Sequence, residues 1–142
     1  MIVVAIGNDH AGLGLKQELA LFLQENNKEV LDFGTNSQQP ADYPDYADAV
    51  VKAILEGSAE AGVLVCGTGI GMSIAANRHK GIRAALCHDV FSAAAARRHN
   101  NANILVMGAR VVGGGHAKEI AKAFFGEQFS GEARHSMRLA KL

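Results

Sequence analysis

The chain has 142 residues, enough for one domain with a buried core. Its 14 lysine and arginine residues equal its 14 aspartate and glutamate residues, and this zero net charge argues against a nucleic-acid-binding protein, which usually carries a basic excess. No apolar run reaches the ~18 residues of a membrane span, and the first ten residues lack the charged region and cleavage site of a signal peptide.

Short apolar runs alternate with helical patterns along the whole chain. The expected strands are residues 2–6, 29–33, 63–66, 83–86 and 104–107. Helical spacing of apolar residues or high alanine content predicts helices around residues 15–23, 46–54, 72–79, 90–98 and 117–124, and a final helix is expected at 132–142. This alternation predicts a single α/β domain, residues 1–142, in which helices cover both faces of a five-stranded parallel sheet.

Polar and glycine-rich motifs follow several of the predicted strands. They are G-N-D-H-A-G at 7–12, C-G-T-G-I-G at 66–71, C-H-D at 87–89 and G-A-R-V-V-G-G-G at 108–115. Ligands bind at the carboxyl ends of the strands in an open parallel sheet, so we expect the functional site at this edge. The longest irregular stretch, residues 34–44, is polar and holds both prolines.

The G-N-D-H-A-G motif places two polar side chains, Asp9 and His10, in the loop after the first strand. Gly7 and Gly12 flank them, which indicates a tight turn. One interpretation is that both side chains face a ligand. The alternative is that Asp9 only caps the following helix.

The C-G-T-G-I-G motif ends a predicted strand and opens a predicted helix. Its glycines at 67, 69 and 71 leave successive backbone N–H groups unobstructed, which suits an anion or a developing oxyanion. The motif is not a P-loop, and Met72 breaks the glycine spacing of the dinucleotide fingerprint. Asp89 still lies about where a ribose-binding acid would fall, so a nucleotide-binding module remains an alternative.

The two cysteines, Cys66 and Cys87, are too few for a disulfide framework, so we expect free thiols and a reducing, cytoplasmic setting. Cys66 stands directly before the glycine loop, where a helix N-terminus favours the thiolate. A thiolate at this place can act as a base or a nucleophile. Cys87 fits a small buried apolar residue.

Several basic or polar side chains outside the glycine loop are further candidates for the site. His99 and Asn100 end the fourth predicted helix, where a histidine is often only a partner of the helix dipole. Arg110 ends the fifth strand and is better placed for a ligand than for solvent. Arg134 and Arg138 share one helix face and suit a phosphate, although a solvated basic face is the favoured interpretation of this pair taken alone. The histidine and cysteine spacings match no metal motif, so no metal is expected.

Taken together, these motifs resemble the type B ribose-5-phosphate isomerases, a family shared with the galactose-6-phosphate isomerase subunits. The resemblance covers essentially the whole chain. It rests on the motifs at 7–12 and 66–71, the latter continuing to residue 77, and on D-Y-P-D-Y-A at 42–47, G-I-R-A at 81–84, R-H-N-N-A-N at 98–103, G-A-R-V-V-G at 108–113 and R-H-S-M-R at 134–138.

The resemblance implies a Rossmann-like three-layer sandwich and a cofactor-free aldose–ketose isomerase that interconverts ribose 5-phosphate and ribulose 5-phosphate through an enediolate. It further implies a homodimer, or a tetramer built from such dimers, with each active site shared between two subunits. Cys66 is then the catalytic base, and His99 opens the sugar ring. The remaining implied contacts are Thr68 with the backbone of Gly67, Gly69, Ile70 and Gly71 for the enediolate, Asp9 and Asn100 for hydroxyls, His10, Arg134 and Arg138 for phosphate, Arg110 nearby, and Tyr43 lining the site.

Two positions sharpen this interpretation. One branch of the family carries a glutamate base just after the glycine loop, but this chain has Met72 there, so Cys66 has no rival. Position 8 is Asn8, where the family is expected to have cysteine or serine. This neighbour of Asp9 is expected to touch the sugar and to affect which sugar is accepted.

Three alternatives remain from the sequence. The substrate can be another sugar phosphate, such as an allose, galactose or tetrose phosphate. The chain can be a nucleotide- or flavin-binding module that uses the glycine loop and Asp89. It can also be a catalytically silent partner of a related isomerase subunit.

Overall fold

The computed structural model describes residues 1–142 and contains a five-stranded, all-parallel sheet in the order β2-β1-β3-β5-β4. The strands are β1 (Val3–Asn8), β2 (Glu29–Asp32), β3 (Ala61–Cys66), β4 (Ala84–Leu86) and β5 (Ile104–Gly108). A 3-10 turn (His10–Gly12) precedes the helices α1 (Leu13–Glu25), α2 (Tyr43–Leu55), α3 (Ile70–Ala76), α4 (Val90–Asn100), α5 (Gly114–Phe125) and α6 (Ala133–Leu139). Every predicted strand and helix is present, and the ends differ by at most three residues.

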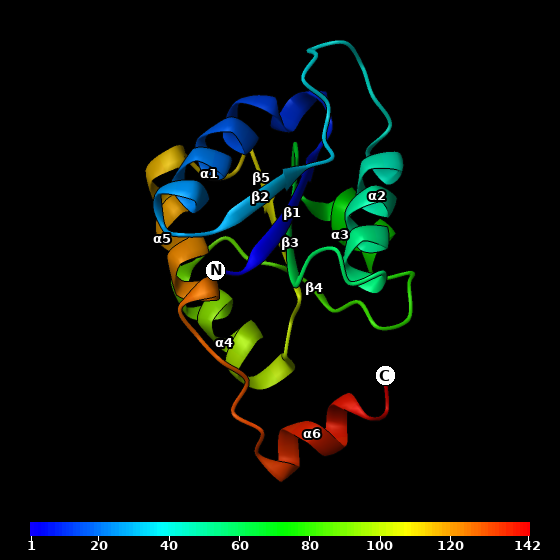
Figure 1. Ribbon diagram of the computed structural model, residues 1–142, viewed down its shortest axis with the longest axis vertical. Helices are drawn as coiled ribbons and strands as arrows, with labels where there is room; N and C mark the ends of the chain where they lie inside the picture. The colour runs from blue at the N-terminus through cyan, green and yellow to red at the C-terminus, as the bar shows by residue number, and fades with distance from the viewer.

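Helices cover both faces of the sheet, which confirms the predicted Rossmann-like α/β sandwich (Figure 1). One apolar cluster joins the sheet to α1, α4 and α5 through residues such as Leu19 and Phe124. A second cluster joins the opposite face to α2 and α3 through residues such as Val50 and Met72. The central strand β3 is buried along its whole length, as a strand covered on both faces should be.

Helix α2 begins earlier than expected, inside the stretch 34–44 that was predicted to be irregular. Its first residue is Tyr43, and Pro44 lies in its first turn. Proline is tolerated there because its missing N–H would have no partner within the helix and its backbone angle already suits the helix. Pro44 therefore helps to start the helix rather than to end the loop.

The order of the strands determines where a ligand can enter. The chain turns from β1 to α1 on one face and from β3 to α3 on the other, although β1 and β3 are neighbours in the sheet. The loops that follow these two strands therefore diverge and leave a crevice at their carboxyl ends. The motifs at 7–12 and 66–71 are those two loops.

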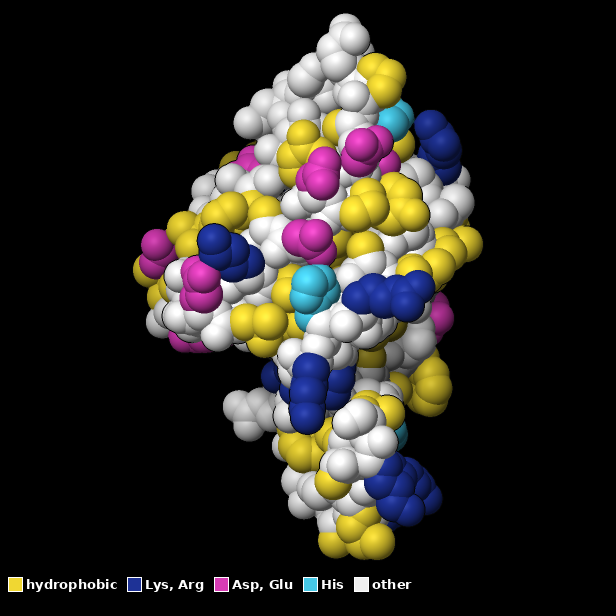
Figure 2. All heavy atoms as spheres, turned by 90° about the vertical axis from the view of Figure 1, so that its right-hand side faces the viewer, with side chains coloured by type: hydrophobic (Ala, Val, Ile, Leu, Met, Phe, Trp, Pro, Cys, Tyr) yellow, Lys and Arg dark blue, Asp and Glu magenta, His cyan; other side chains and the backbone are white.

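Helix α6 stands apart from the sandwich, beyond the amino ends of the strands (Figure 1). Seen from the side of α2 and α3, it projects from the body, and Lys and Arg side chains gather near the junction (Figure 2). His135 is its buried residue. Helix α6 contacts the rest of the chain mainly through α4.

Candidate active site

The loop after β1 is closely packed against the end of β3. The backbone N–H of Asp9 donates to the carbonyl of Val65 at 3.3 Å, and a Cβ on Gly12 would lie 2.5 Å from that same oxygen. Oδ1 of Asp9 accepts hydrogen bonds from the N–H groups of Ala11, at 3.0 Å, and Gly12, at 3.2 Å. The capping interpretation of Asp9 is therefore correct for this oxygen, while Oδ2 makes no hydrogen bond within the chain and is left for a ligand.

Cys66 lies at the end of β3 and is 5% exposed. The backbone N–H of Gly69 donates to its Sγ at 3.2 Å. Gly69 has a φ of 80°, and a Cβ there would lie 2.5 Å from Cδ1 of Leu86, so the turn that delivers this donor requires glycine. A donor in this position stabilises negative charge on the sulfur.

The glycine loop, residues 66–71, and the first turn of α3 also present backbone donors that the chain does not use. The N–H groups of Gly67, Thr68, Gly71 and Met72 make no hydrogen bond within the chain. The Thr68 hydroxyl oxygen accepts from the N–H of Ile70 at 3.2 Å, which leaves its own O–H to donate elsewhere. Four N–H groups and one hydroxyl beside the Cys66 thiol form a site suited to an oxyanion.

Two side chains from other elements close over this loop. A Cβ on Gly71 would lie 2.6 Å from the ring of Tyr43, at the start of α2. A Cβ on Gly67 would lie 3.0 Å from a terminal nitrogen of Arg110, which follows β5. Arg110 forms no ion pair within the chain, so its charge is available to an anion.

A second group of predicted site residues lies at the opposite end of the sheet. Cys66 is paired with Gly108 at the carboxyl end of β5, whereas Asn100 ends α4 just before the amino end of that strand at Ile104. The two ends of β5 are separated by about 13 Å, at ~3.3 Å per residue. His99 and Asn100 therefore lie far from Cys66 of the same chain.

Helix α6 brings Arg134 and Arg138 to this second group. The rings of His99 and His135 stack with centroids 4.5 Å apart. The Nε of Arg134 donates to a carboxylate oxygen of Glu132 at 3.0 Å, while Arg138 forms no ion pair. Burial, followed by the positive charges of Arg134 and His99, lowers the pKa of His135 from its ordinary value of 6.5. Its Nε2 is buried without a partner.

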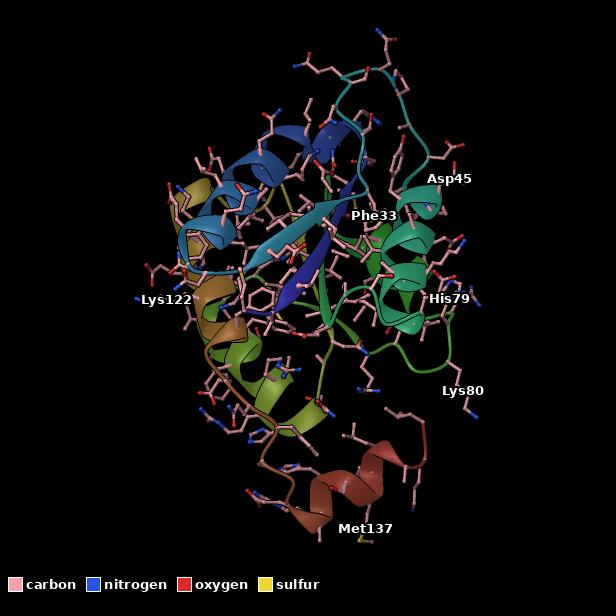
Figure 3. All side chains as sticks on the ribbon, viewed as in Figure 1. Phe33, Asp45, His79, Lys80, Lys122 and Met137 are labelled. Atoms are coloured by element: carbon pink, nitrogen blue, oxygen red, sulfur yellow. The ribbon has the colours of Figure 1, made fainter.

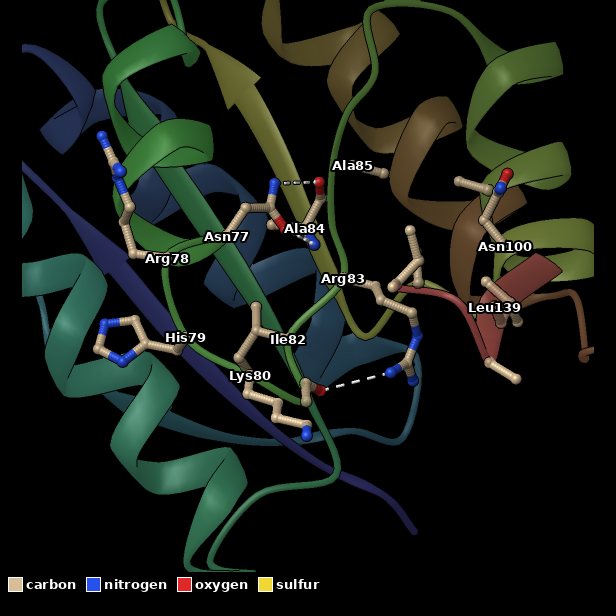
Figure 4. Close-up of a pocket in the computed structure, with 15 residues that line it drawn as sticks. Asn77, Arg78, His79, Lys80, Ile82, Arg83, Ala84, Ala85, Asn100 and Leu139 are labelled. Atoms are coloured by element: carbon tan, nitrogen blue, oxygen red, sulfur yellow. Dashed lines mark hydrogen bonds between the residues drawn. The ribbon is translucent and has the colours of Figure 1, made fainter.

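A cavity of about 1000 Å³ separates α6 from the segment that leads into β4 (Figure 4). Asn77, Arg78, Lys80 and Arg83 line one side, and Asn100 and Leu139 line the other. The side-chain amide of Asn77 binds both the N–H and the carbonyl of Ala84, which holds this segment in place. The cavity is open to solvent, and the basic side chains of Arg78, Lys80 and Arg83 are part of its lining.

Two side chains with predicted or possible ligand roles, Asn8 and Asp89, make hydrogen bonds within the chain. Asn8 is fully buried, and its amide donates to the carbonyls of Asp9, at 2.8 Å, and Thr35, at 3.1 Å, so it faces a neighbouring loop. Asp89 caps α4, with Ser92 N–H and Oγ donating to its two carboxylate oxygens at 2.7 and 2.6 Å. The nucleotide alternative therefore loses its ribose-binding acid to a helix cap.

Sequence reasoning missed Lys16. This lysine on α1 is 1% exposed, and its Nζ donates to Asp32 at 2.8 Å, to Asn36 at 2.8 Å and to the carbonyl of Thr35 at 3.2 Å. In the sequence it stands beside Leu15, within a pattern of apolar residues that predicts a helix face packed against the core and gives no indication of a buried charge. No group of three or more His, Cys, Asp or Glu side chains is arranged to hold a metal ion. No helix combines the length and apolar character needed to cross a membrane.

Comparisons with known proteins give one consistent result. The model of the family described as Ribose/Galactose Isomerase matches residues 4–142. Ribose-5-phosphate isomerase B of Escherichia coli is 46% identical over 96% of this chain and 91% of its own. D-erythrulose-4-phosphate isomerase of Pectobacterium atrosepticum is 44% identical over 92% of this chain and 87% of its own. A ribose 5-phosphate isomerase structure from Thermotoga maritima has a TM-score of 0.96 and 48% identity, over 99% of this chain and 96% of that one.

Proposed function

Because this chain belongs to the ribose/galactose isomerase family, it is a sugar phosphate isomerase, and we propose that it interconverts ribose 5-phosphate and ribulose 5-phosphate. The similarity to ribose-5-phosphate isomerase B of Escherichia coli supports this substrate pair. The similarity to D-erythrulose-4-phosphate isomerase makes a tetrose phosphate the second candidate. The observation that best supports the chemistry is the Cys66 thiol beside the free N–H groups of the glycine loop.

In the proposed reaction Cys66 is the base. Its thiolate removes the proton from C2 of the open-chain sugar, and negative charge develops on the oxygen of the former carbonyl. The free N–H groups of the glycine loop and the Thr68 hydroxyl stabilise that charge, and one such donor contributes roughly 3 kcal/mol to the transition state. Cys66 then returns the proton to C1, while O1 gains a hydroxyl proton and O2 loses one, so the thiolate is regenerated.

The phosphate is held away from the reacting carbons. We assign it to His10, Arg134 and Arg138, with Arg110 nearby, because guanidinium groups bind phosphate through paired hydrogen bonds. Arg110 and Arg138 have no carboxylate partner to displace. This binding energy positions C1 and C2 against Cys66.

His99 and Asn100 require a second subunit. Within one chain they lie at the amino ends of the strands, while Cys66 lies at the carboxyl ends. A two-fold dimer in which α4 and α6 of one subunit face the glycine loop of the other places all of them in each of two equal sites. The exposed side chains of Ile70 and Ile74 on α3, beside the glycine loop, suit such an interface.

In this shared site His99 opens the sugar ring, Asn100 and Oδ2 of Asp9 bind hydroxyls, and Tyr43 lines the wall. The stack with His135 orients the His99 ring. A second subunit also covers the crevice, which keeps water from the enediolate.

The substrate is tested with a panel of sugar phosphates in a coupled isomerase assay: ribose 5-phosphate, allose 6-phosphate, galactose 6-phosphate and a tetrose 4-phosphate. We expect the highest kcat/KM with ribose 5-phosphate. A higher kcat/KM with another member would replace the proposed substrate but keep the isomerase. A Cys66→Ala variant that still exchanges the C2 proton of ribose 5-phosphate with deuterium from solvent would overturn the role of Cys66.

A further inference from the structure

The segment between β2 and α2 projects beyond the carboxyl edge of the sheet, and its two ends lie beside the end of β1 and the loop that follows (Figure 1). It consists of residues 33–42; Phe33, at its start, and Asp45, in the first turn of α2 just after it, are labelled in Figure 3. Near its end, the backbone N–H of Ala41 donates a hydrogen bond to Nδ1 of His10 at 3.1 Å. The two residues are 31 positions apart in the sequence, so only the folded chain brings them together.

This contact determines which ring nitrogen of His10 carries the proton. A backbone N–H can only donate, so Nδ1 must accept through its lone pair and cannot itself be protonated. The ring is then neutral, and its single proton is on Nε2. His10 consequently offers one N–H donor, at Nε2.

The beginning of the same segment is anchored to the elements on either side of His10. The carbonyl of Thr35 accepts from Nζ of Lys16 on α1 and from the side-chain amide of Asn8 at the end of β1. Lys16 uses its other two N–H bonds on Asp32 and Asn36. Because Lys16 is 1% exposed and Asp32 neutralises its charge, its attachment to the segment is sheltered from water.

The close approach of this anchor requires a small residue. A Cβ on Gly34 would lie 1.8 Å from Oδ1 of Asn8, so any other residue would push the segment away from β1. Asn8 and Lys16 thus hold one end of the segment, and the Ala41 N–H reaches His10 from the other end.

We propose that the segment of residues 33–42 is a positioning element for His10: through the Ala41 N–H it holds the ring in the neutral tautomer whose Nε2–H is the donor offered to an anionic ligand. Lys16 and Asn8 are positioning residues that hold this segment. The identity of the anion as the substrate phosphate rests on the proposed function. The tautomer of His10 and the contact that determines it do not depend on the proposed function.

The direct test is nuclear magnetic resonance of the uniformly 15N-labelled full chain. A scalar coupling across the hydrogen bond is expected between the Ala41 amide nitrogen and Nδ1 of His10, and the ring nitrogen shifts should show Nδ1 unprotonated and Nε2 protonated. A protonated Nδ1, or no coupling to Ala41 at neutral pH, would overturn the proposal. This measurement does not depend on which substrate the enzyme uses.

The effect on function is tested with a matched pair of variants. Ala41→Pro removes the N–H, whereas Ala41→Ser keeps it. We expect Ala41→Pro to raise KM for ribose 5-phosphate about threefold to tenfold, the range for loss of one hydrogen bond, with kcat nearly unchanged. Ala41→Ser should keep both the coupling and the wild-type KM.

Equal KM values in the two variants would overturn the functional part of the proposal. If neither variant nor the wild type acts on ribose 5-phosphate, the proposed substrate fails, and the coupling experiment still decides the tautomer. Retention of the wild-type tautomer populations in Ala41→Pro would show that the segment does not determine them.

Discussion

The backbone N–H of Gly69 and the Sγ atom of Cys66 are 3.2 Å apart, and the donor points at the sulfur from within the loop that also holds four unused N–H groups. In the proposed mechanism the same loop would stabilise two charges, one on the Cys66 thiolate before the proton transfer and the other on the substrate oxygen after it. Negative charge would then move between two places that both already have donors, so the mechanism would need little rearrangement of the protein.

The two cysteines should behave differently. Cys66→Ala should abolish deuterium exchange at C2 and leave binding of a phosphate-containing substrate nearly intact, because only the base is removed. Cys87→Ala should have near-normal exchange: burial raises the pKa of the Cys87 thiol and outweighs the lowering effect of its hydrogen bond with Ser92, so it is uncharged at neutral pH. Exchange measured by nuclear magnetic resonance checks both, and equal losses in the two variants would contradict this assignment.

Gly69→Ala should damage both stability and turnover. The added Cβ meets Leu86 and the backbone of Met107 at a positive φ, so the turn must shift and the donor to Cys66 moves. We expect a loss of roughly 1–3 kcal/mol in the free energy of unfolding, from strain and overpacking, and at least a tenfold drop in kcat.

Gly115→Ala is the matched control for that substitution. A Cβ at Gly115 meets nothing within 4 Å, and the residue lies in α5. Alanine there should leave kcat unchanged and stabilise the helix by up to about 1 kcal/mol. Urea unfolding and steady-state kinetics on both variants separate strain at the loop from a general effect of replacing glycine.

Two inactive variants should restore each other's activity. In an equal mixture of refolded Cys66→Ala and His99→Gln chains, half of the dimers are mixed, and each mixed dimer has one site with neither change. Roughly a quarter of all sites should then be active. Coupled-assay activity of the mixture measures this fraction.

The control for this mixing experiment pairs Cys66→Ala with Thr68→Val. Both changes lie in the same loop, so every mixed dimer carries one altered residue in each site and no activity should return. Activity in the control equal to that of the Cys66→Ala and His99→Gln mixture would contradict the shared site.

His135 should make the fold less stable in mild acid. Its pKa is lowered in the folded state, first by burial and then by the charges of Arg134, His99 and Arg138, against an opposing effect of Glu132. The unfolded chain therefore binds more protons as the pH falls, so this contribution to stability is present above about pH 6.5 and is lost below it. The free energy of unfolding should be lower at pH 5.5 than at pH 8.

His135→Phe removes the titrating group but keeps an aromatic ring against His99. We expect this variant to lose less stability between pH 8 and pH 5.5 than the wild type does. Urea unfolding at both pH values, with the protein concentration held constant, provides the comparison. If His135→Phe loses as much stability between pH 8 and pH 5.5 as the wild type does, the pH effect comes from other groups.

The sequence alone was sufficient to predict the helices and strands, the fold class and the family. Apolar residues on consecutive positions, as in residues 63–66, predicted strands buried on both faces, and the position of the motifs after these strands predicted that the glycine loop and the loop of Asp9 share the carboxyl edge of the sheet. These features depend on local periodicity and on the rule that ligands bind at the carboxyl ends of parallel strands, so a linear pattern contains them. The strand order, which makes the two loops neighbours, came from the structure. The resemblance to the isomerase family, drawn from short motifs over the whole chain, was confirmed.

Only the tertiary structure decided which side chains meet. Lys16 lies on an apolar helix face, and nothing near it in sequence indicates that Asp32 and Thr35 will surround its ammonium group. The contact of Ala41 with His10 joins two loops, and it depends on the path that the β2–α2 segment takes back to α2. Such contacts are set by the packing of elements far apart in the chain, whereas the formation of each element follows from its own residues.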